Sequence, residues 1–104
     1  HIDVAACKAR GVAVANVPNY STDATAELAI GLIISHLRRL PQCHDNVNKG
    51  LWACPPQEDL QSKTVGLVGV GRIGMRLADL FKAFKVKGLQ GFSLTQEAEF
   101  TSNG

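Results

Sequence analysis

The sequence predicts an α/β fold that forms part of a doubly wound parallel sheet. Residues 64–70 are apolar, bounded by glycine and typical of a buried strand, and a glycine-rich turn follows them at once. Apolar residues then recur at helical spacing from Ile73 to Phe84, and a second strand is expected over residues 87–94. A strand, a helix and a strand in this order predict a βαβ unit with parallel strands.

Length and composition limit the function classes. The chain has 104 residues, of which 45% are hydrophobic and 19% charged, values typical of a globular protein. A formal net charge of +2 gives no indication of nucleic acid as a partner. The apolar run from Leu28 to Ile34 is shorter than the roughly 20 residues that span a bilayer, so no membrane segment is expected. Because the chain opens at His1 without a signal-peptide pattern, we expect a fragment of a cytoplasmic protein.

The cysteines form an odd set without a C-x-x-C pair, at Cys7, Cys43 and Cys54. This pattern favours reduced thiols over a disulfide scaffold. Only His44 lies beside a cysteine, and no second pair has the spacing of zinc ligands, so no metal site is predicted. None of the thiols has a basic partner nearby in sequence, and we expect all of them to be inert.

The first segments predict a short helix and a short strand. The helix is expected over residues 4–10, with Asp3 as its N-cap and Gly11 as its end. Valines alternating with alanines over residues 12–17 predict a buried strand.

A longer helix is predicted from Ala24 to Leu40. Pro41 ends or kinks this helix, and a polar helical stretch is expected to continue to Lys49, before Gly50. In the connection that follows, the single tryptophan, Trp52, is expected to anchor in an apolar notch. The apolar residues of the long helix are expected to form one face: Leu28, Leu32, Ile33, Leu37 and Leu40.

The turn after the first strand of the βαβ unit is a G-x-G-x-x-G motif. Gly69 permits a tight turn, Gly71 lets a pyrophosphate approach the backbone, and Gly74 lets the helix pack closely on the strand. The first-turn amides, including those of Arg72 and Ile73, point unpaired N–H groups at such an anion. Between a strand and a helix the motif predicts dinucleotide binding, and the alternative is a turn that binds nothing.

One feature of an NAD site is absent, an acidic residue about 20 residues after the motif. The window from Gln90 to Thr95 contains none. A carboxylate there would repel a 2′-phosphate, so the sequence leans toward NADP over NAD, although no arginine is present to bind that phosphate. Ser93 and Thr95 are candidate hydrogen-bond donors, and Lys87 is a candidate charge. The alternative is a diverged strand that binds the ribose poorly.

Five segments follow one another in a specific order along the chain: NVP at 16–18, STDATAELA at 21–29, RR at 38–39, GLW at 50–52 and TVGLVGVGRIG at 64–74. Taken together, they resemble the D-isomer-specific 2-hydroxyacid dehydrogenases, most of all their glyoxylate/hydroxypyruvate reductase branch. The resemblance covers nearly the whole chain.

The resemblance implies a two-domain enzyme that transfers a hydride between NAD(P) and a small 2-keto or D-2-hydroxy acid. It divides the chain into the end of a substrate domain (1–20), a helix for dimerisation with its connection (21–62) and the first βαβ unit of a Rossmann-type domain (63–104). The helix from Ala24 to Leu40 implies a homodimer. The cofactor-binding residues that it implies are Gly69, Gly71, Arg72, Ile73, Gly74 and Thr25.

The resemblance also places the catalytic arginine, glutamate and histidine in later sequence, so no catalytic residue is assigned here. We interpret His36 as packed at a helix interface and His44 as solvated. The chain alone is expected to be inactive, with an incomplete sheet of about three strands and a mobile tail after Thr95. Two alternatives are a non-catalytic dimerisation or regulatory module derived from such an enzyme, and a domain that binds S-adenosylmethionine.

Overall fold

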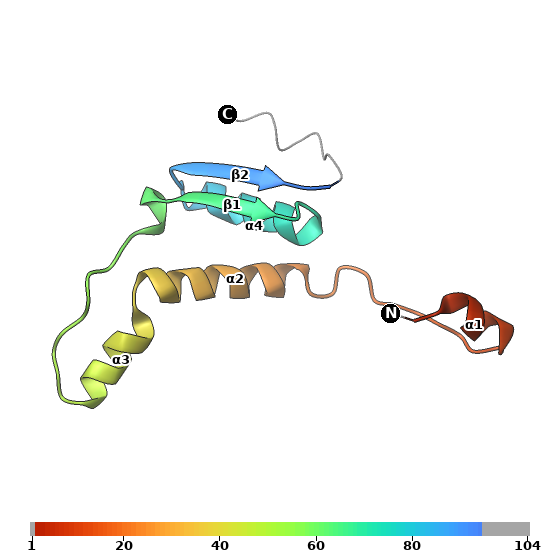
Figure 1. Cartoon of the computed structure of the whole chain (residues 1–104), viewed down its shortest axis with the longest axis horizontal. Coiled ribbons are helices and arrows are strands. Elements are labelled where there is room, and N and C mark those ends of the chain that lie inside the picture. Colours follow the sequence, from red (N-terminus) through yellow and green to blue (C-terminus); the bar gives the residue numbers. More distant parts are fainter. Residues whose placement is uncertain (1, 95–104) are drawn as a thin grey trace.

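The computed structural model describes residues 2–94. The molecule is extended, with dimensions of 64 × 40 × 18 Å, and α1 stands at the end of an arm (Figure 1). The predicted mobile tail and the candidate donor Thr95 lie outside the described residues. The elements are α1 (Val4–Ala9), α2 (Thr22–Leu37), α3 (Leu40–Asn48), the 3₁₀ turn η1 (Leu60–Ser62), β1 (Thr64–Val68), α4 (Arg72–Ala83) and β2 (Gly88–Phe92).

The predicted βαβ unit is confirmed. Strands β1 and β2 pair in parallel, with Thr64 opposite Gly88 and Val68 opposite Phe92, and α4 connects them (Figure 1). Strand β1 ends before the predicted residue 70 because Gly69 adopts a φ of +92° and begins the turn. In the described part of the chain the sheet has two strands, one fewer than expected.

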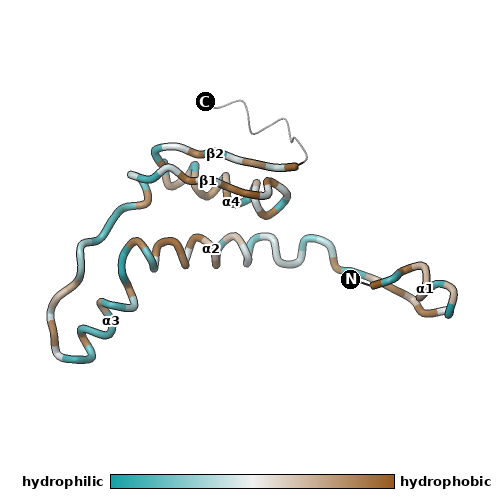
Figure 2. Tube along the Cα trace, viewed as in Figure 1, coloured by the Kyte–Doolittle hydropathy of each residue, from teal (hydrophilic) through white to brown (hydrophobic). Residues whose placement is uncertain are grey.

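The core lies between α2, α4 and the sheet. Its centre is a cluster of Ile30, Leu60 and Phe81, of which Phe81 is 1% exposed. Val65, Leu67 and Leu89 of the sheet pack against this cluster, whereas Val68 and Phe92 remain exposed. Figure 2 shows the apolar stretch of α2 lying alongside the sheet and α4.

The long helix breaks earlier than predicted. Helix α2 ends at Leu37, and Arg39 adopts a left-handed φ of +52° before α3 begins. The prediction of one helix from Ala24 to Leu40 is therefore wrong at its C-terminal end. Pro41 has no N–H to donate and so cannot lie in the interior of a continuous helix, but it fits the first turn of a new helix, where no N–H bond is needed. The predicted polar helical stretch is confirmed as α3.

The predicted single apolar face of the long helix is also wrong. Leu28 and Leu32 are each 63% exposed, whereas Ile33 and Leu37 pack against the core. Ile30, rather than Leu28 or Leu32, lies at the centre of the buried face. Leu28 and Leu32 lie one turn apart, and their two-residue offset from Ile30 puts them on the opposite side of the helix.

The arm before α2 confirms one prediction and contradicts another. Asp3 caps α1 by accepting a hydrogen bond from the Ala6 amide at 2.9 Å, and Gly11 follows the helix with a φ of +69°. Residues 12–17 form no strand and are exposed throughout. A strand needs a neighbour to satisfy its backbone, and the one sheet in the described residues pairs β1 with β2 alone.

The segment after α3 contradicts the cysteine prediction. Cys43 and Cys54 form a disulfide with their Cα atoms 5.1 Å apart, and Cys7 remains free. Their separation of 11 residues gave no sequence signal, because the fold of the α3 hairpin brings them together. Trp52 is 97% exposed, so the prediction that it anchors in a notch is wrong as well.

Helix α4 ends in a motif that favours glycine. Lys85 has a φ of +53°, its N–H donates to the Lys82 carbonyl, and the Val86 N–H donates to the Phe81 carbonyl. This is the Schellman arrangement, in which the left-handed residue is most often glycine.

Replacing Lys85 by glycine is expected to raise the free energy of unfolding by up to about 1 kcal/mol, because the left-handed strain exceeds the entropy that glycine adds to the unfolded chain. Thermal unfolding followed by circular dichroism measures the change. Lys85→Ala is the matched control, since it removes the charge but keeps Cβ. Equal melting temperatures for the two variants would contradict the strain at this position.

Candidate functional site

The glycine turn lies at the carboxyl end of β1. The Gly69 N–H donates to the Phe92 carbonyl at 2.7 Å and so ties the turn to the end of β2. Val70, between the first two glycines, is 3% exposed and anchors the turn in the interior. The carboxyl ends of parallel strands are where ligands bind in open α/β sheets.

Gly71 and Gly74 have different surroundings. A Cβ at Gly74 would overlap the Gly69 carbonyl oxygen and lie 3.2 Å from its carbonyl carbon. A Cβ at Gly71 would meet no atom within 4 Å. The lack of a side chain at Gly74 therefore allows the helix to pack closely on the turn. The lack of a side chain at Gly71 instead leaves the backbone accessible to a ligand, as a pyrophosphate-binding turn requires.

The first turn of α4 supplies hydrogen-bond donors. The first helical donor is the Met75 N–H, which donates to the Gly71 carbonyl at 2.8 Å, so the amides of residues 71–74 have no partner within the helix. Arg72 and Ile73 are exposed, and no acidic residue lies in this first turn. The helix start thus combines free N–H groups with the positive end of the helix dipole, an arrangement that attracts phosphate.

The segment before α2 borders the same turn. Residues 16–22, together with Arg72 and Ile73, line a hollow of about 170 Å³. The Arg76 Nε donates to the Asp23 carboxylate at 2.6 Å and holds the start of α2 against α4. Sequence reasoning missed this pair, because its partners are 53 residues apart and no local pattern links them.

Thr25 is exposed in the first turn of α2, and its N–H donates to the Ser21 carbonyl at 2.9 Å. Ser21 and Thr22, rather than Thr25, line the hollow with Arg72. The structure thus brings Gly69, Gly71, Arg72, Ile73 and Gly74 into one turn, whereas Thr25 does not line the hollow beside it.

Two of the candidate ribose-binding residues, Ser93 and Lys87, flank β2. Ser93 follows Phe92, whose carbonyl accepts the bond from the glycine turn, so Ser93 lies at the site. Lys87 precedes β2, next to the start of β1, about 16 Å of strand away. Lys87 and Ser93 therefore lie at opposite ends of β2.

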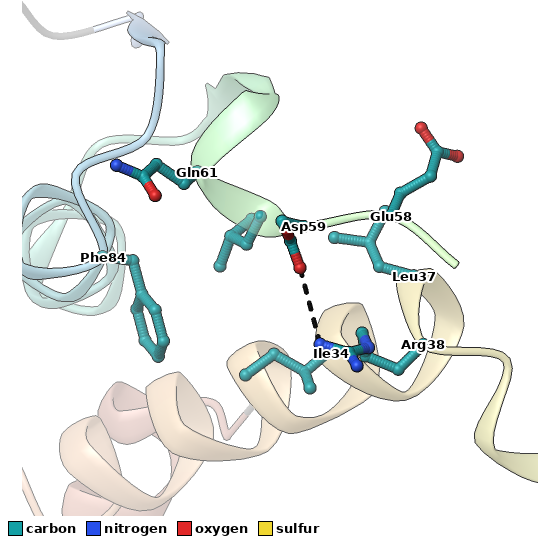
Figure 3. A pocket seen from close by; sticks show the side chains of 8 residues that line it. Ile34, Leu37, Arg38, Glu58, Asp59, Gln61 and Phe84 are labelled. Carbon is teal, nitrogen blue, oxygen red and sulfur yellow. Dashed lines mark hydrogen bonds and ion pairs between the residues drawn. The ribbon is translucent and has the colours of Figure 1, made fainter. Parts of the chain in front are cut away.

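A second hollow, of about 290 Å³, lies at the other end of α4. Figure 3 shows Phe84 and Ile34 on its apolar side and the Arg38–Asp59 ion pair, at 3.5 Å, across it. Glu58, also at its rim, accepts a hydrogen bond from Lys63, and this bond holds the pKa of that carboxyl below its usual value. These contacts fasten the segment before β1 to the end of α2.

The described histidines lie away from the glycine turn. His36 is exposed in the last turn of α2, so its predicted packing at a helix interface is wrong. His44 is exposed on α3, where its Nε2 lies 3.0 Å from the Asn48 side-chain nitrogen. Among residues 2–94, no three histidine, cysteine or acidic side chains are grouped to hold a metal, and none of the helices is long and apolar enough to cross a membrane.

A glycine turn between a parallel strand and a helix defines the nucleotide-binding class of α/β domains. Residues 30–102 match the model of the D-isomer specific 2-hydroxyacid dehydrogenase family, NAD binding domain. The chain belongs to this family, and its fold is a partial Rossmann-like NAD-binding domain. Both identifications agree with the resemblance found from sequence.

Similar proteins include both lactate and glyoxylate enzymes. The chain is 37% identical to a D-lactate dehydrogenase of Lactiplantibacillus pentosus, which it matches over its whole length, and 43% identical over 81% of its length to a glyoxylate/hydroxypyruvate reductase of Arabidopsis thaliana. These alignments cover 32% and 27% of the two relatives, so the chain spans about a third of their length.

Solved structures show the same fold. A D-lactate dehydrogenase with NAD+ from Lactobacillus jensenii superposes with a TM-score of 0.80 at 31% identity, over 96% of this chain and 31% of that one. An NADPH-dependent glyoxylate/hydroxypyruvate reductase from Sinorhizobium meliloti, in complex with NADP and malonate, gives 0.76 at 38% identity, over 93% of this chain and 32% of that one.

Proposed function

We propose that this chain holds the nicotinamide dinucleotide in a cytoplasmic oxidoreductase that acts on a small 2-keto or D-2-hydroxy acid of the glyoxylate/hydroxypyruvate type. The observation that carries the proposal is the open position of Gly71 beside unpaired first-turn amides. Gly69 and Gly74 shape the turn, the amides of Arg72 and Ile73 donate to the pyrophosphate, and Thr25 lies next to the cofactor. The dinucleotide, when bound, supplies the hydride chemistry, and this chain supplies its position.

The same proposal divides the chain into three parts. Residues 1–20 belong to the end of the substrate domain, residues 21–62 connect and dimerise, and residues 63–104 begin the NAD(P)-binding domain. Proton transfer and substrate binding need a base or acid and a cation at the nicotinamide. His36 and His44 lie on α2 and α3, remote from the glycine turn. We therefore propose that the chain alone is inactive, and steady turnover of glyoxylate or hydroxypyruvate with NADPH would overturn this.

Isothermal titration calorimetry of the folded chain tests the cofactor part of the proposal. NADPH, NADH and S-adenosylmethionine are titrated in parallel, with folding verified by circular dichroism. Heat of binding with a reduced pyridine nucleotide supports the proposal, and the same ligand raises the melting temperature. Binding of S-adenosylmethionine alone, or of none of the three, contradicts it.

The expected preference for NADP over NAD predicts the effect of one substitution. Ser93→Asp places a carboxylate directly after β2, where it accepts hydrogen bonds from a ribose and repels a 2′-phosphate. We expect this variant to weaken NADPH binding about tenfold or more relative to NADH binding. The matched control is Ser93→Asn, which has the same size without the charge and leaves the NADPH/NADH ratio near that of the unchanged chain. An unchanged ratio in the aspartate variant would place the ribose elsewhere.

A second candidate function is dimerisation through α2, the helix that the sequence predicts from Ala24 to Leu40. The supporting observation is the exposed pair Leu28 and Leu32, on the side of α2 that faces away from the core. Light scattering after size-exclusion chromatography should find a dimer, and Leu28→Glu with Leu32→Glu should convert it to a monomer. A monomeric unchanged chain would remove this candidate and the derived alternative of a non-catalytic dimerisation or regulatory module.

A further inference from the structure

Two cysteines meet where α3 and the segment after it run side by side. Cys43 lies in α3, Cys54 lies in the largely exposed segment of residues 49–59, and their Cα atoms are 5.1 Å apart, within the usual range for a disulfide. We propose that this pair is a reversible modification site, at which thiol–disulfide exchange with a small disulfide such as oxidised glutathione fixes or releases the segment. The proposal is independent of cofactor binding.

Contacts other than the disulfide keep the two sulfurs near each other. The Asn46 side chain donates to the Ala53 carbonyl at 2.8 Å, and the Leu51 N–H donates to the Asn46 carbonyl at the same distance. Cys54 precedes Pro55, which restricts its backbone to extended conformations. The two reduced thiols therefore stay close enough to form the disulfide again, as a reversible site requires.

The surroundings assign different roles to the two thiols. Cys54 is exposed, whereas Cys43 is half-buried and accepts a hydrogen bond from the Gln57 side-chain amide at 3.5 Å. Arg38 donates to the other end of that amide at 2.9 Å and so polarises it toward the sulfur. Since a thiolate is the attacking species, this hydrogen bond favours Cys43 as the thiol that displaces glutathione from Cys54.

The exchange balances in two steps. The Cys54 thiolate attacks one sulfur of oxidised glutathione, which breaks the glutathione S–S bond, forms a mixed disulfide and releases one glutathione thiolate. The Cys43 thiolate then attacks the Cys54 sulfur, forms the internal disulfide and releases the second glutathione thiolate. The two cysteine protons pass to solvent and protonate the leaving thiolates, so two cysteines are oxidised and one glutathione disulfide is reduced.

The disulfide adds to the hydrogen bonds that hold residues 51–54 against α3. The hydrogen bonds that attach the segment to α3 are exposed, and Leu51 and Trp52 are 53% and 97% exposed. Breaking the disulfide opens a loop between residues separated by 11 positions, which increases the conformational freedom of the unfolded chain. Reduction is expected to lower the melting temperature by on the order of 10 °C.

Thiol trapping tests the proposal on the full chain. The chain is equilibrated in mixtures of reduced and oxidised glutathione, approached from both redox directions, and then alkylated and weighed by mass spectrometry. We expect a single transition from three labelled cysteines to one, Cys7, with the fluorescence of the single tryptophan changing in step. A pair that stays reduced in excess oxidised glutathione, or that carries stable glutathione on both sulfurs, overturns the proposal.

Substitutions test the assigned roles. Cys43→Ser should accumulate one glutathione on Cys54, and Gln57→Leu should slow closure of the mixed disulfide several-fold. Cys7→Ser is the matched control and should keep the whole transition, because Cys7 lies on α1. Equal rates of closure with Gln57 and with leucine would show that the amide plays no part.

Discussion

Replacing Gly74 by alanine is expected to destabilise the chain by about 3 kcal/mol, a loss on the order of 10 °C in melting temperature. The added methyl group would overlap the Gly69 carbonyl oxygen, which is backbone rather than a movable side chain. That carbonyl cannot retreat freely, because the Gly69 N–H is bonded to Phe92. The strain would therefore separate α4 from the turn, and thermal unfolding by circular dichroism measures it.

Gly71→Ala is the matched control for this result. It adds the same methyl group three residues earlier, where no atom lies within 4 Å. Its melting temperature should fall by a few degrees at most, since alanine is only a poorer N-cap than glycine. If the Gly74 variant melted at the temperature of the Gly71 variant, the close contact of helix and turn would be refuted.

Replacing Gly71 by valine is expected to weaken dinucleotide binding about 100-fold or more while the chain stays folded. The side chain would occupy the open space through which a pyrophosphate reaches the first-turn amides of α4. A 100-fold loss corresponds to about 2.7 kcal/mol of binding free energy. Calorimetric titration with NADPH and NADH gives the two dissociation constants.

The control for Gly71→Val is Gly66→Val in β1. A Cβ added at Gly66 would likewise meet no atom within 4 Å, and valine suits a strand. Binding should be unchanged in this variant. Retained affinity in Gly71→Val, with both chains folded, would mean that the ligand does not approach the glycine turn and that the amides there serve no phosphate.

The βαβ unit was predictable because its signals are local. Gly69 must supply a positive φ for the turn, and the apolar spacing from Ile73 to Phe84 specifies a helix without reference to any other segment. The same holds for Asp3 and Gly11 at the ends of α1. In each case the residue type itself determines the backbone geometry.

Other features depend on contacts that a sequence does not display. Leu28 and Ile30 are equally apolar, and only the position of α4 decides that Ile30 is buried and Leu28 exposed. The strand expected over residues 12–17 lacked a partner for its backbone. Cys43 and Cys54 became a pair through the hairpin that α3 makes with the following segment.

The ion pair between Asp23 and Arg76 joins residues that are 53 positions apart, and this separation orders the folding process. The βαβ unit consists of neighbours in sequence, so it closes short loops at low entropic cost. Docking of α2 onto the βαβ unit must close a far longer loop. The contacts that α2 makes compensate for this entropic cost only when docking is complete. Helix α2 should therefore join last during refolding, and deuterium labelling in short pulses should mark its amides after those of α4 are already protected.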